Sequence, residues 1–214
     1  MKTTLIVIRH GFSTANKTKI FSGCLDVELT ETGRKQASLA ASYLRERGGI
    51  DKVYSSDLKR AHNTAIPVAK ALELPVILEE GFREVDAGEW EGLPFYDILE
   101  RYPVEYTLWQ EDIGRFICPG GESAEPFWNR ILSSVDRIAE ENEGKTVVIA
   151  SHATPIRVMC TAAAGLPLEW MQEIPWVRNA SINTFEHENG CLKQLKLDFT
   201  DHLGEYIIES TDRL

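Results

Sequence analysis

Two short aliphatic runs lie near opposite ends of the chain, and a histidine follows each of them. Residues 4–8 and 146–150 have the length and composition of strands that are buried on both faces of a sheet. His10 and His152 come just after these runs. Because a strand buried on both faces needs a helical layer on each side, the runs predict an α/β fold. Both histidines are then expected at the carboxyl edge of the sheet, where ligands bind in such folds.

Predicted strands and helices alternate along most of the chain. Apolar periodicity predicts helices over residues 30–47, 59–72, 122–141 and 155–164. Thr30 is the expected N-cap of the first helix, and Gly48-Gly49 is its expected stop. Further strands are predicted over residues 52–55 and 76–78, and a closing hairpin over 181–186 and 191–197, around Glu188-Asn189-Gly190. The repeated units predict one domain over residues 1–214, a three-layer α/β sandwich with a mostly parallel central sheet.

Residues 88–125 interrupt this alternation. The aromatic residues of the segment are Trp90, Phe95, Tyr96, Tyr102, Tyr106, Trp109 and Phe116. It ends in Pro119-Gly120-Gly121. Since the predicted site lies at the carboxyl edge of the sheet, we expect this insertion to form a helical, aromatic lid over it. The alternative is that it only packs as a satellite core.

The charge balance limits the classes of partner. The 214 residues include 23 basic and 33 acidic side chains, which gives a net charge of −10. A binder of nucleic acid or of an anionic membrane needs a basic face, so neither partner is expected. No apolar run reaches the length of a membrane span or a signal peptide, which predicts a cytoplasmic protein. The cysteines form no CxxC pair, so they are expected as reduced thiols, with a redox role left open only for Cys24.

Two arginines are predicted close to the histidines. Arg9 directly precedes His10, and Arg60 follows the strand predicted over residues 52–55. A phosphoryl group carries close to two negative charges near neutral pH, and guanidinium groups match its oxygens with bidentate hydrogen bonds. A neutral imidazole can attack phosphorus and hold the group covalently. These residues therefore predict phosphoryl chemistry on a phosphate monoester without a metal ion.

Five short motifs follow one another over nearly the whole chain. They are Arg9-His10-Gly11-Phe12-Ser13 with Asn16; Leu29-Thr30-Glu31-Thr32-Gly33 with Gln36-Ala37; Ser55-Ser56-Asp57-Leu58-Lys59-Arg60-Ala61 with Thr64-Ala65; Arg83-Glu84 with Gly88-Glu89-Trp90-Glu91-Gly92; and Pro119-Gly120-Gly121-Glu122-Ser123, followed by Ser151-His152 and Ile156-Arg157. In this order they resemble the signatures of the histidine phosphatase superfamily, also called the phosphoglycerate mutase-like family. Within that family the arrangement is similar to α-ribazole phosphatases and broad-specificity phosphatases.

The resemblance implies a role for each matching residue. His10 is the expected nucleophile, which becomes phosphohistidine. Glu84 is the expected general acid and later the base that activates water, a double role that needs a carboxyl pKa raised by partial burial. The expected clamp on the phosphoryl oxygens is Arg9, Arg60 and His152, and the further substrate contacts are Ser13, Asn16, Ser22, Gly23 and Ala153. The implied partner is a small phosphorylated metabolite, with no cofactor and no metal; a homodimer stays open.

A phosphatase is preferred over two alternatives, a phosphoglycerate mutase and a non-catalytic module that binds phospho-ligands. Mutases resemble one another in an acid block that reads Glu-Arg-His-Tyr-Gly and in an arginine pair that holds a substrate carboxylate. Here the acid block reads Glu84-Val85-Asp86-Ala87-Gly88, and the insertion holds only the separated Arg101 and Arg115. A second anionic group on the substrate is thus expected to find no arginine pair that binds it. Ala153-Thr154-Pro155 stands where many relatives carry glycines, which leaves the substrate size open.

Overall fold

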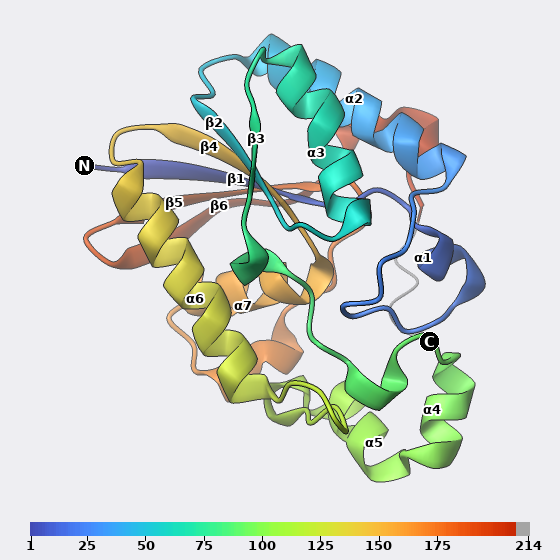
Figure 1. The fold of residues 1–214 in the computed structure, drawn as a ribbon. Helices are drawn as coiled ribbons and strands as arrows, with labels where there is room; N and C mark the ends of the chain where they lie inside the picture. The colour runs from blue at the N-terminus through green and yellow to red at the C-terminus, as the bar shows by residue number, and fades with distance from the viewer. Residues whose placement is uncertain (209–214) are drawn as a thin grey trace.

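A six-stranded sheet forms the centre of the molecule (Figure 1). The computed structural model describes residues 1–208. In spatial order, the strands are β3 (Val76–Leu78), β2 (Lys52–Ser55), β4 (Thr146–Ser151), β1 (Thr3–Arg9), β5 (Ile182–Glu188) and β6 (Cys191–Phe199). The first four are parallel, and β5 and β6 run antiparallel to their neighbours. The predicted α/β fold with a mostly parallel sheet is confirmed.

Helices cover both faces of the sheet. The helices α2 (Glu31–Arg47) and α3 (Lys59–Ala71) lie on one face, and α6 (Ala124–Glu141) and α7 (Ala153–Ala163) lie on the other (Figure 1). Alternate side chains of β1 enter the two cores: Ile6 and Ile8 belong to the core with α2 and α3, whereas Leu5 and Val7 belong to the core with α6 and α7. This alternation is why the run is apolar at every position, and it confirms the three layers.

Local signals explain where most helices begin and end. The Thr30 hydroxyl accepts a hydrogen bond from the Gly33 amide at the start of α2, and Gly48, with a φ of 64°, ends the helix as expected. Two predicted starts are wrong by two residues. Helix α7 begins at Ala153 because Pro155 falls in the first turn, where no backbone N–H is needed. Helix α6 begins at Ala124 rather than Glu122.

The hairpin is longer than predicted. Strand β5 continues to Glu188 and β6 to Phe199, so only Asn189-Gly190 forms the turn. Both turn residues have positive φ values, 52° and 73°. Those values match the two-residue turn that an Asn-Gly pair favours.

The aromatic segment folds into short helices beside α1 (Thr14–Thr18), at the lower right of Figure 1. Its elements are η2 (Gly88–Trp90), α4 (Phe95–Arg101), α5 (Pro103–Glu111) and η3 (Ile113–Arg115). Trp90, Trp109 and Phe116 are buried in the core that also holds the α6 and α7 face of the sheet. The remaining short helices are η1 (Glu80–Phe82), η4 (Leu168–Glu173) and η5 (Asp201–Tyr206). None of the helices in residues 1–208 has the length and apolar composition needed to cross a lipid bilayer.

Candidate active site

The carboxyl ends of β1 and β4 meet at one edge of the sheet. In the sheet register Arg9 lies opposite Ser151. The next residues, His10 and His152, therefore leave neighbouring strands side by side, and the centroids of their rings are 5.3 Å apart. The sheet topology thus brings together two histidines that are far apart in the sequence.

A pocket opens at this edge. Its polar lining consists of Arg9, His10, Asn16, Lys19, Ser22, Arg60, Glu84 and Thr154. Its apolar lining consists of Ala15, Ile20, Phe21, Val85, Phe95, Trp109, Ala153 and Trp176. Phe95 and Trp109 come from α4 and α5, so the aromatic segment supplies part of the pocket wall. The pocket therefore combines groups that bind a phosphoryl anion with an aromatic surface that can contact an organic moiety.

His10 is held in one tautomer. The residue is only 5% exposed, and Nδ1 lies 2.8 Å from the carbonyl oxygen of Gly11. Because a carbonyl oxygen only accepts, Nδ1 carries the proton and Nε2 keeps its lone pair. Burial, followed by the charges of Arg60 and Arg9, holds the pKa of His10 well below its usual value. The imidazole is neutral at physiological pH, which is the nucleophilic form.

His152 is completely buried beside His10. Its Nε2 lies 2.8 Å from the hydroxyl of Ser56, whereas its Nδ1 has no hydrogen-bond partner within residues 1–208. Burial, then Arg60 and His10, lower the pKa of this imidazole well below the usual value. Its Nδ1 is therefore the ring nitrogen available to an oxygen bound next to His10.

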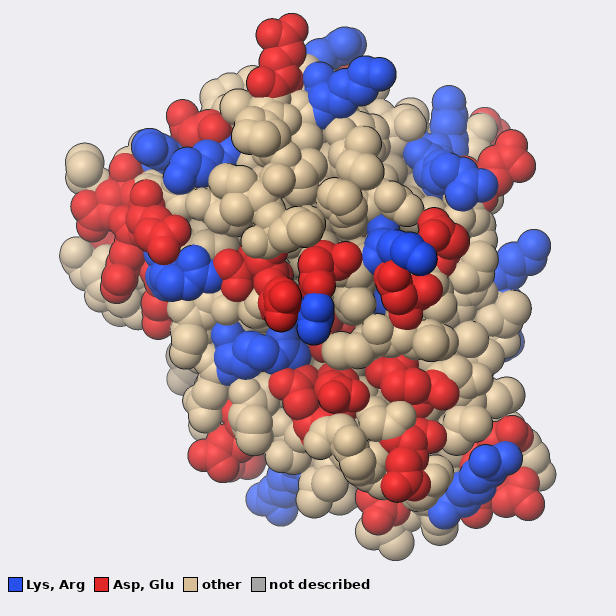
Figure 2. Space-filling view, in the orientation of Figure 1, with Lys and Arg blue, Asp and Glu red and all other residues tan. Residues whose placement is uncertain are grey.

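Two buried guanidinium groups flank the histidines. Arg9 donates to the Val177 carbonyl at 2.6 Å. Arg60 donates to carbonyl oxygens of the loop after α1, those of Ser22, Gly23 and Leu25, at 2.6–2.9 Å. Burial lowers the pKa of Arg60 only to about 10, so it remains a cation at neutral pH. Figure 2 shows acidic and basic side chains interspersed over one face of the molecule rather than gathered in a basic patch, so anion binding depends on these local groups.

Glu84 supplies the carboxyl group of the pocket. Its Oε1 accepts from the amide of Val85 at 2.9 Å, and its Oε2 accepts from the amide of Thr154 at 3.2 Å. Burial raises the pKa of Glu84, although both hydrogen bonds and the charge of Arg60 work against it. A carboxyl group with a raised pKa can give up a proton near neutral pH and take one back.

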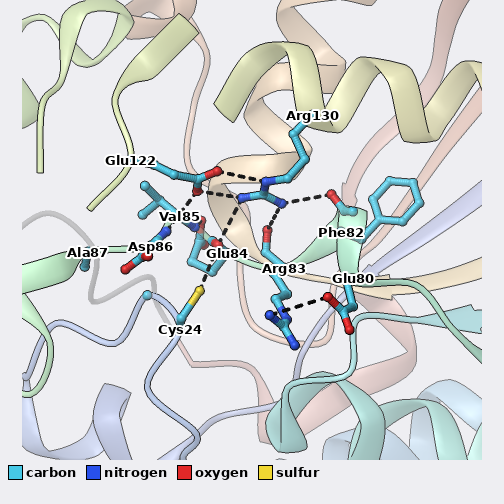
Figure 3. Close-up of polar contacts among 12 residues, drawn as sticks. Cys24, Glu80, Phe82, Arg83, Glu84, Val85, Asp86, Ala87, Glu122 and Arg130 are labelled. Atoms are coloured by element: carbon cyan, nitrogen blue, oxygen red, sulfur yellow. Dashed lines mark hydrogen bonds and ion pairs between the residues drawn. The ribbon is translucent and has the colours of Figure 1, made fainter. Parts of the chain in front are cut away.

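Arg130 on α6 holds the loop that carries Glu84 (Figure 3). It donates to the carbonyl oxygens of Gly81, Arg83 and Glu84 at 2.9–3.3 Å and to both carboxylate oxygens of Glu122 at 2.9 and 2.7 Å. Oε2 of Glu122 in turn accepts from the amide of Asp86, on the other side of Glu84. One side chain therefore fixes the backbone around Glu84.

The other expected contacts divide into two groups. Asn16, Ser22 and Ala153 line the pocket, whereas Ser13 and Gly23 do not. The buried Ser13 caps α1, and its hydroxyl donates to Oδ1 of Asn16 at 2.9 Å. A Cβ atom on Gly23 would overlap the carbonyl oxygen of Val85, so glycine allows the loop after α1 to approach the loop of Glu84.

Several residues that hold the site were missed from the sequence. The buried Asn179 donates to the His10 carbonyl at 3.1 Å and to Oδ1 of Asn16 at 3.2 Å. The Thr64 hydroxyl accepts from the Gly11 amide at 3.0 Å and donates to the Arg60 carbonyl at 2.7 Å. Thr64 and Ser56 stand inside motifs, so a signal existed. Asn179, Lys19 and Arg130 stand outside the five motifs, and only the fold brings them to the site.

Cys24 lies against the loop of Glu84 without a reactive environment. Its Sγ is 3.7 Å from the Glu84 carbonyl oxygen, and burial, then Asp86 and Glu91, raise the pKa of the thiol to about 11. Although Cys24, Asp86 and Glu91 lie close enough to share an ion, the Glu91 carboxylate already accepts from three backbone amides of the surrounding loops. Glu91 therefore anchors these loops.

Comparisons with known proteins agree with this geometry. The family model of the histidine phosphatase superfamily (branch 1) matches residues 5–199. Phosphoserine phosphatase 1 of Hydrogenobacter thermophilus is 36% identical over 206 residues, which cover 96% of this chain and 97% of that protein. Among solved structures, Bacillus stearothermophilus YhfR has a TM-score of 0.89 and 27% identity and covers 94% of this chain and 99% of its own. The α-ribazole phosphatase of Shigella flexneri has a TM-score of 0.81 and 26% identity, and it covers 91% of this chain and 96% of its own.

Proposed function

The chain belongs to the histidine phosphatase superfamily and is a phosphatase, and on this premise we propose that it hydrolyses small phosphomonoesters through a phosphoryl group carried on Nε2 of His10. The observation that carries the proposal is the hydrogen bond between Nδ1 of His10 and the Gly11 carbonyl, 2.8 Å long. It turns the lone pair of a neutral imidazole away from Gly11, in a pocket that two buried arginines also line.

In the first step, Nε2 of His10 attacks phosphorus, and the bond from phosphorus to the oxygen of the leaving alcohol breaks. Arg9, Arg60 and Nδ1 of His152 hold the phosphoryl oxygens as charge develops on them. Burial raises the pKa of Glu84 and so favours the protonated carboxyl, which gives its proton to the leaving oxygen. The products are phosphohistidine and the free alcohol.

In the second step, water attacks the phosphorus of phosphohistidine, and the P–N bond breaks. The Glu84 carboxylate formed in the first step accepts the proton of that water. Inorganic phosphate leaves, and both His10 and Glu84 return to their starting states. Neither step needs a group beyond the side chains that line the pocket and His152.

The surroundings of the pocket do not favour a mutase. Arg101 and Arg115 lie on the surface of the aromatic segment. The Arg101 guanidinium is 3.8 Å from the Asp97 carboxylate, and the Arg115 guanidinium is 3.7 Å from that of Asp112. Neither lines the pocket, so they do not form the pair that a mutase uses. A non-catalytic module is equally disfavoured because His10, Arg60 and Glu84 all lie in the pocket.

The substrate we propose is a small phosphorylated metabolite, and phosphoserine is the first to test because a relative is named for it. Phe95 and Trp109, from the aromatic segment, would contact the alcohol part, which supports the expected lid role of residues 88–125.

The phosphohistidine can be tested by mixing the protein with radiolabelled ester and quenching the reaction in base. We expect an acid-labile, base-stable label that His10→Ala abolishes and His62→Ala, a change outside the pocket, retains. Label on serine or cysteine would refute the mechanism.

A further inference from the structure

Lys19 is a pocket-lining cation that the proposed phosphoryl chemistry does not use. It forms the C-cap of α1 with a left-handed backbone, φ 55° and ψ 42°, and its amide donates to the Ala15 carbonyl. The Ile20 amide donates to the same carbonyl at 3.2 Å, and Ile20 pairs with Pro94 of the neighbouring loop. The Lys19 backbone is therefore fixed at the pocket on both sides, although its side chain is exposed.

Lys19 carries a positive charge that no carboxylate in the described part of the chain neutralises. Within residues 1–208 no carboxylate lies within 4.0 Å of its ammonium group, and Glu84 is the acid that lines the pocket. By contrast, Lys59, near the same loop, pairs with Asp26 at 3.4 Å. In a chain with a net charge of −10, an uncompensated cation at a pocket gives that spot a local positive potential.

The position of Lys19 indicates which part of a substrate it meets. Lys19 and Phe95 line both the phosphoryl pocket and an adjoining groove, whose other walls include Tyr96, Leu99 and Tyr106 of α4 and α5. With phosphorus at His10, in-line displacement places the leaving alcohol on the side away from His10, and the groove that shares Lys19 and Phe95 with the pocket offers room for it. A negative charge on the alcohol would then meet the ammonium group of Lys19, which forms no ion pair with the other described residues.

We propose that Lys19 binds a carboxylate on the alcohol part of the substrate, so that the enzyme selects phosphomonoesters with a second anionic group. This inference rests on the proposed function and names its substrate class. It also revises the expectation that such a group is poorly served, which considered only the arginines of the insertion. Lys19 contributes to specificity and takes no part in the transfer of the phosphoryl group.

The test compares two esters that differ by one carboxylate, phosphoserine and phosphoethanolamine. We expect the wild type to show a higher kcat/KM for phosphoserine, and Lys19→Met to lower the ratio of the two kcat/KM values roughly 5- to 30-fold, the range of one partly exposed charged hydrogen bond. Lys19→Arg should keep most of the ratio, and Lys19→Glu should reverse the preference. Because the contact is exposed, the wild-type ratio should fall as salt is raised.

Lys17→Met is the matched control, because Lys17 is an exposed lysine of the same short helix that does not line the pocket. It should leave the ratio unchanged. A wild type without preference for phosphoserine, or a Lys19→Met variant that keeps the wild-type ratio, would overturn this inference while p-nitrophenyl phosphate is still hydrolysed. A wild type that hydrolyses none of the three esters refutes the proposed function and, with it, this inference.

Discussion

Burial acts in opposite directions on the two kinds of titratable group in the pocket. It penalises the charged form of each, so it lowers the pKa of His10 and raises that of Glu84. Burial therefore favours the state that each proposed role needs, a neutral imidazole at the proposed nucleophile and a protonated carboxyl at the proposed general acid. Arg60 favours the neutral imidazole as well, and it limits the rise at Glu84. The same buried environment thus favours the forms that both groups need in the first step, the attack on phosphorus.

The role of Glu84 can be tested through the leaving group. A well-placed general acid contributes roughly 10²–10⁴ in rate when the leaving group is a poor one, and less when it is already stable. Glu84→Gln should therefore strongly slow formation of the phosphoenzyme from an alkyl phosphate, and slow it much less for an activated aryl phosphate. Hydrolysis of the phosphoenzyme should be slowed whichever ester formed it, because the attacking water lacks its base. Single-turnover measurements separate these two steps.

Glu89→Gln is the control for this prediction. The Glu89 carboxylate accepts from the Tyr102 hydroxyl at 2.6 Å and does not line the pocket. If Glu89→Gln shows the selective loss with alkyl phosphates, or if Glu84→Gln slows both esters equally, the general acid has been misassigned.

At the scale of elements, α6 positions the proposed general acid, Glu84, from outside the pocket. Arg130 binds three carbonyl oxygens of the loop around Glu84 and the carboxylate of Glu122, which lies just before α6. Arg130→Met should displace this loop, and a shift of about 1 Å can cost on the order of 100-fold in rate. We expect kcat to fall roughly 10- to 100-fold with alkyl phosphates and less with activated aryl phosphates, since the acid is what moves.

Arg137→Met provides the matched change on the same helix. Arg137 pairs with Glu79 and Glu141 and makes no hydrogen bond to the loop of Glu84 within residues 1–208. Arg137→Met should leave the ratio of kcat with alkyl phosphates to kcat with activated aryl phosphates unaltered. An Arg130→Met variant that lost activity equally on both ester types would show general damage rather than displacement of the acid.

Elements with local signals were predictable from the sequence, and elements defined by distant contacts were not. Helix α2 has the predicted bounds because a capping threonine and a glycine mark its ends. Helix α1 was missed, since its five residues carry no apolar periodicity and its start depends on Ser13 and Asn16. The same holds for the site. The motifs predicted His10 and Glu84 at the site, and both line the pocket, whereas Asn179 reaches His10 only because β5 pairs with β1.

For the whole molecule, the buried site makes stability depend on pH. The folded pKa of Glu84 lies above its unfolded value of about 4.5, so the stability of the wild type falls as pH rises from that value through the folded pKa. Gln cannot ionise. The free energy of unfolding of Glu84→Gln relative to the wild type should therefore be greater at pH 8 than at pH 4, whatever constant cost the lost hydrogen bond adds.

Urea unfolding of both proteins at the two pH values measures this difference. The buried histidines act in the other direction, because their folded pKa values are lowered and stability is lost below about pH 6.5. Both proteins contain these histidines, so the contribution of the histidines to the pH dependence cancels, to first order, in the difference between Glu84→Gln and the wild type. A difference that stays constant between the two pH values would contradict the raised pKa of Glu84.

The sheet order has a consequence for the nascent chain. Strand β1 is made first, yet its neighbours are β4, which begins at Thr146, and β5, which begins at Ile182. At 5–20 residues per second, roughly 7 to 30 s pass on the ribosome before the first of these partners is synthesised. For that time the apolar strand that ends just before His10 has two unpaired edges, which other chains can pair with. Expression yield at high temperature should therefore depend on chaperones more than the stability of the finished fold implies.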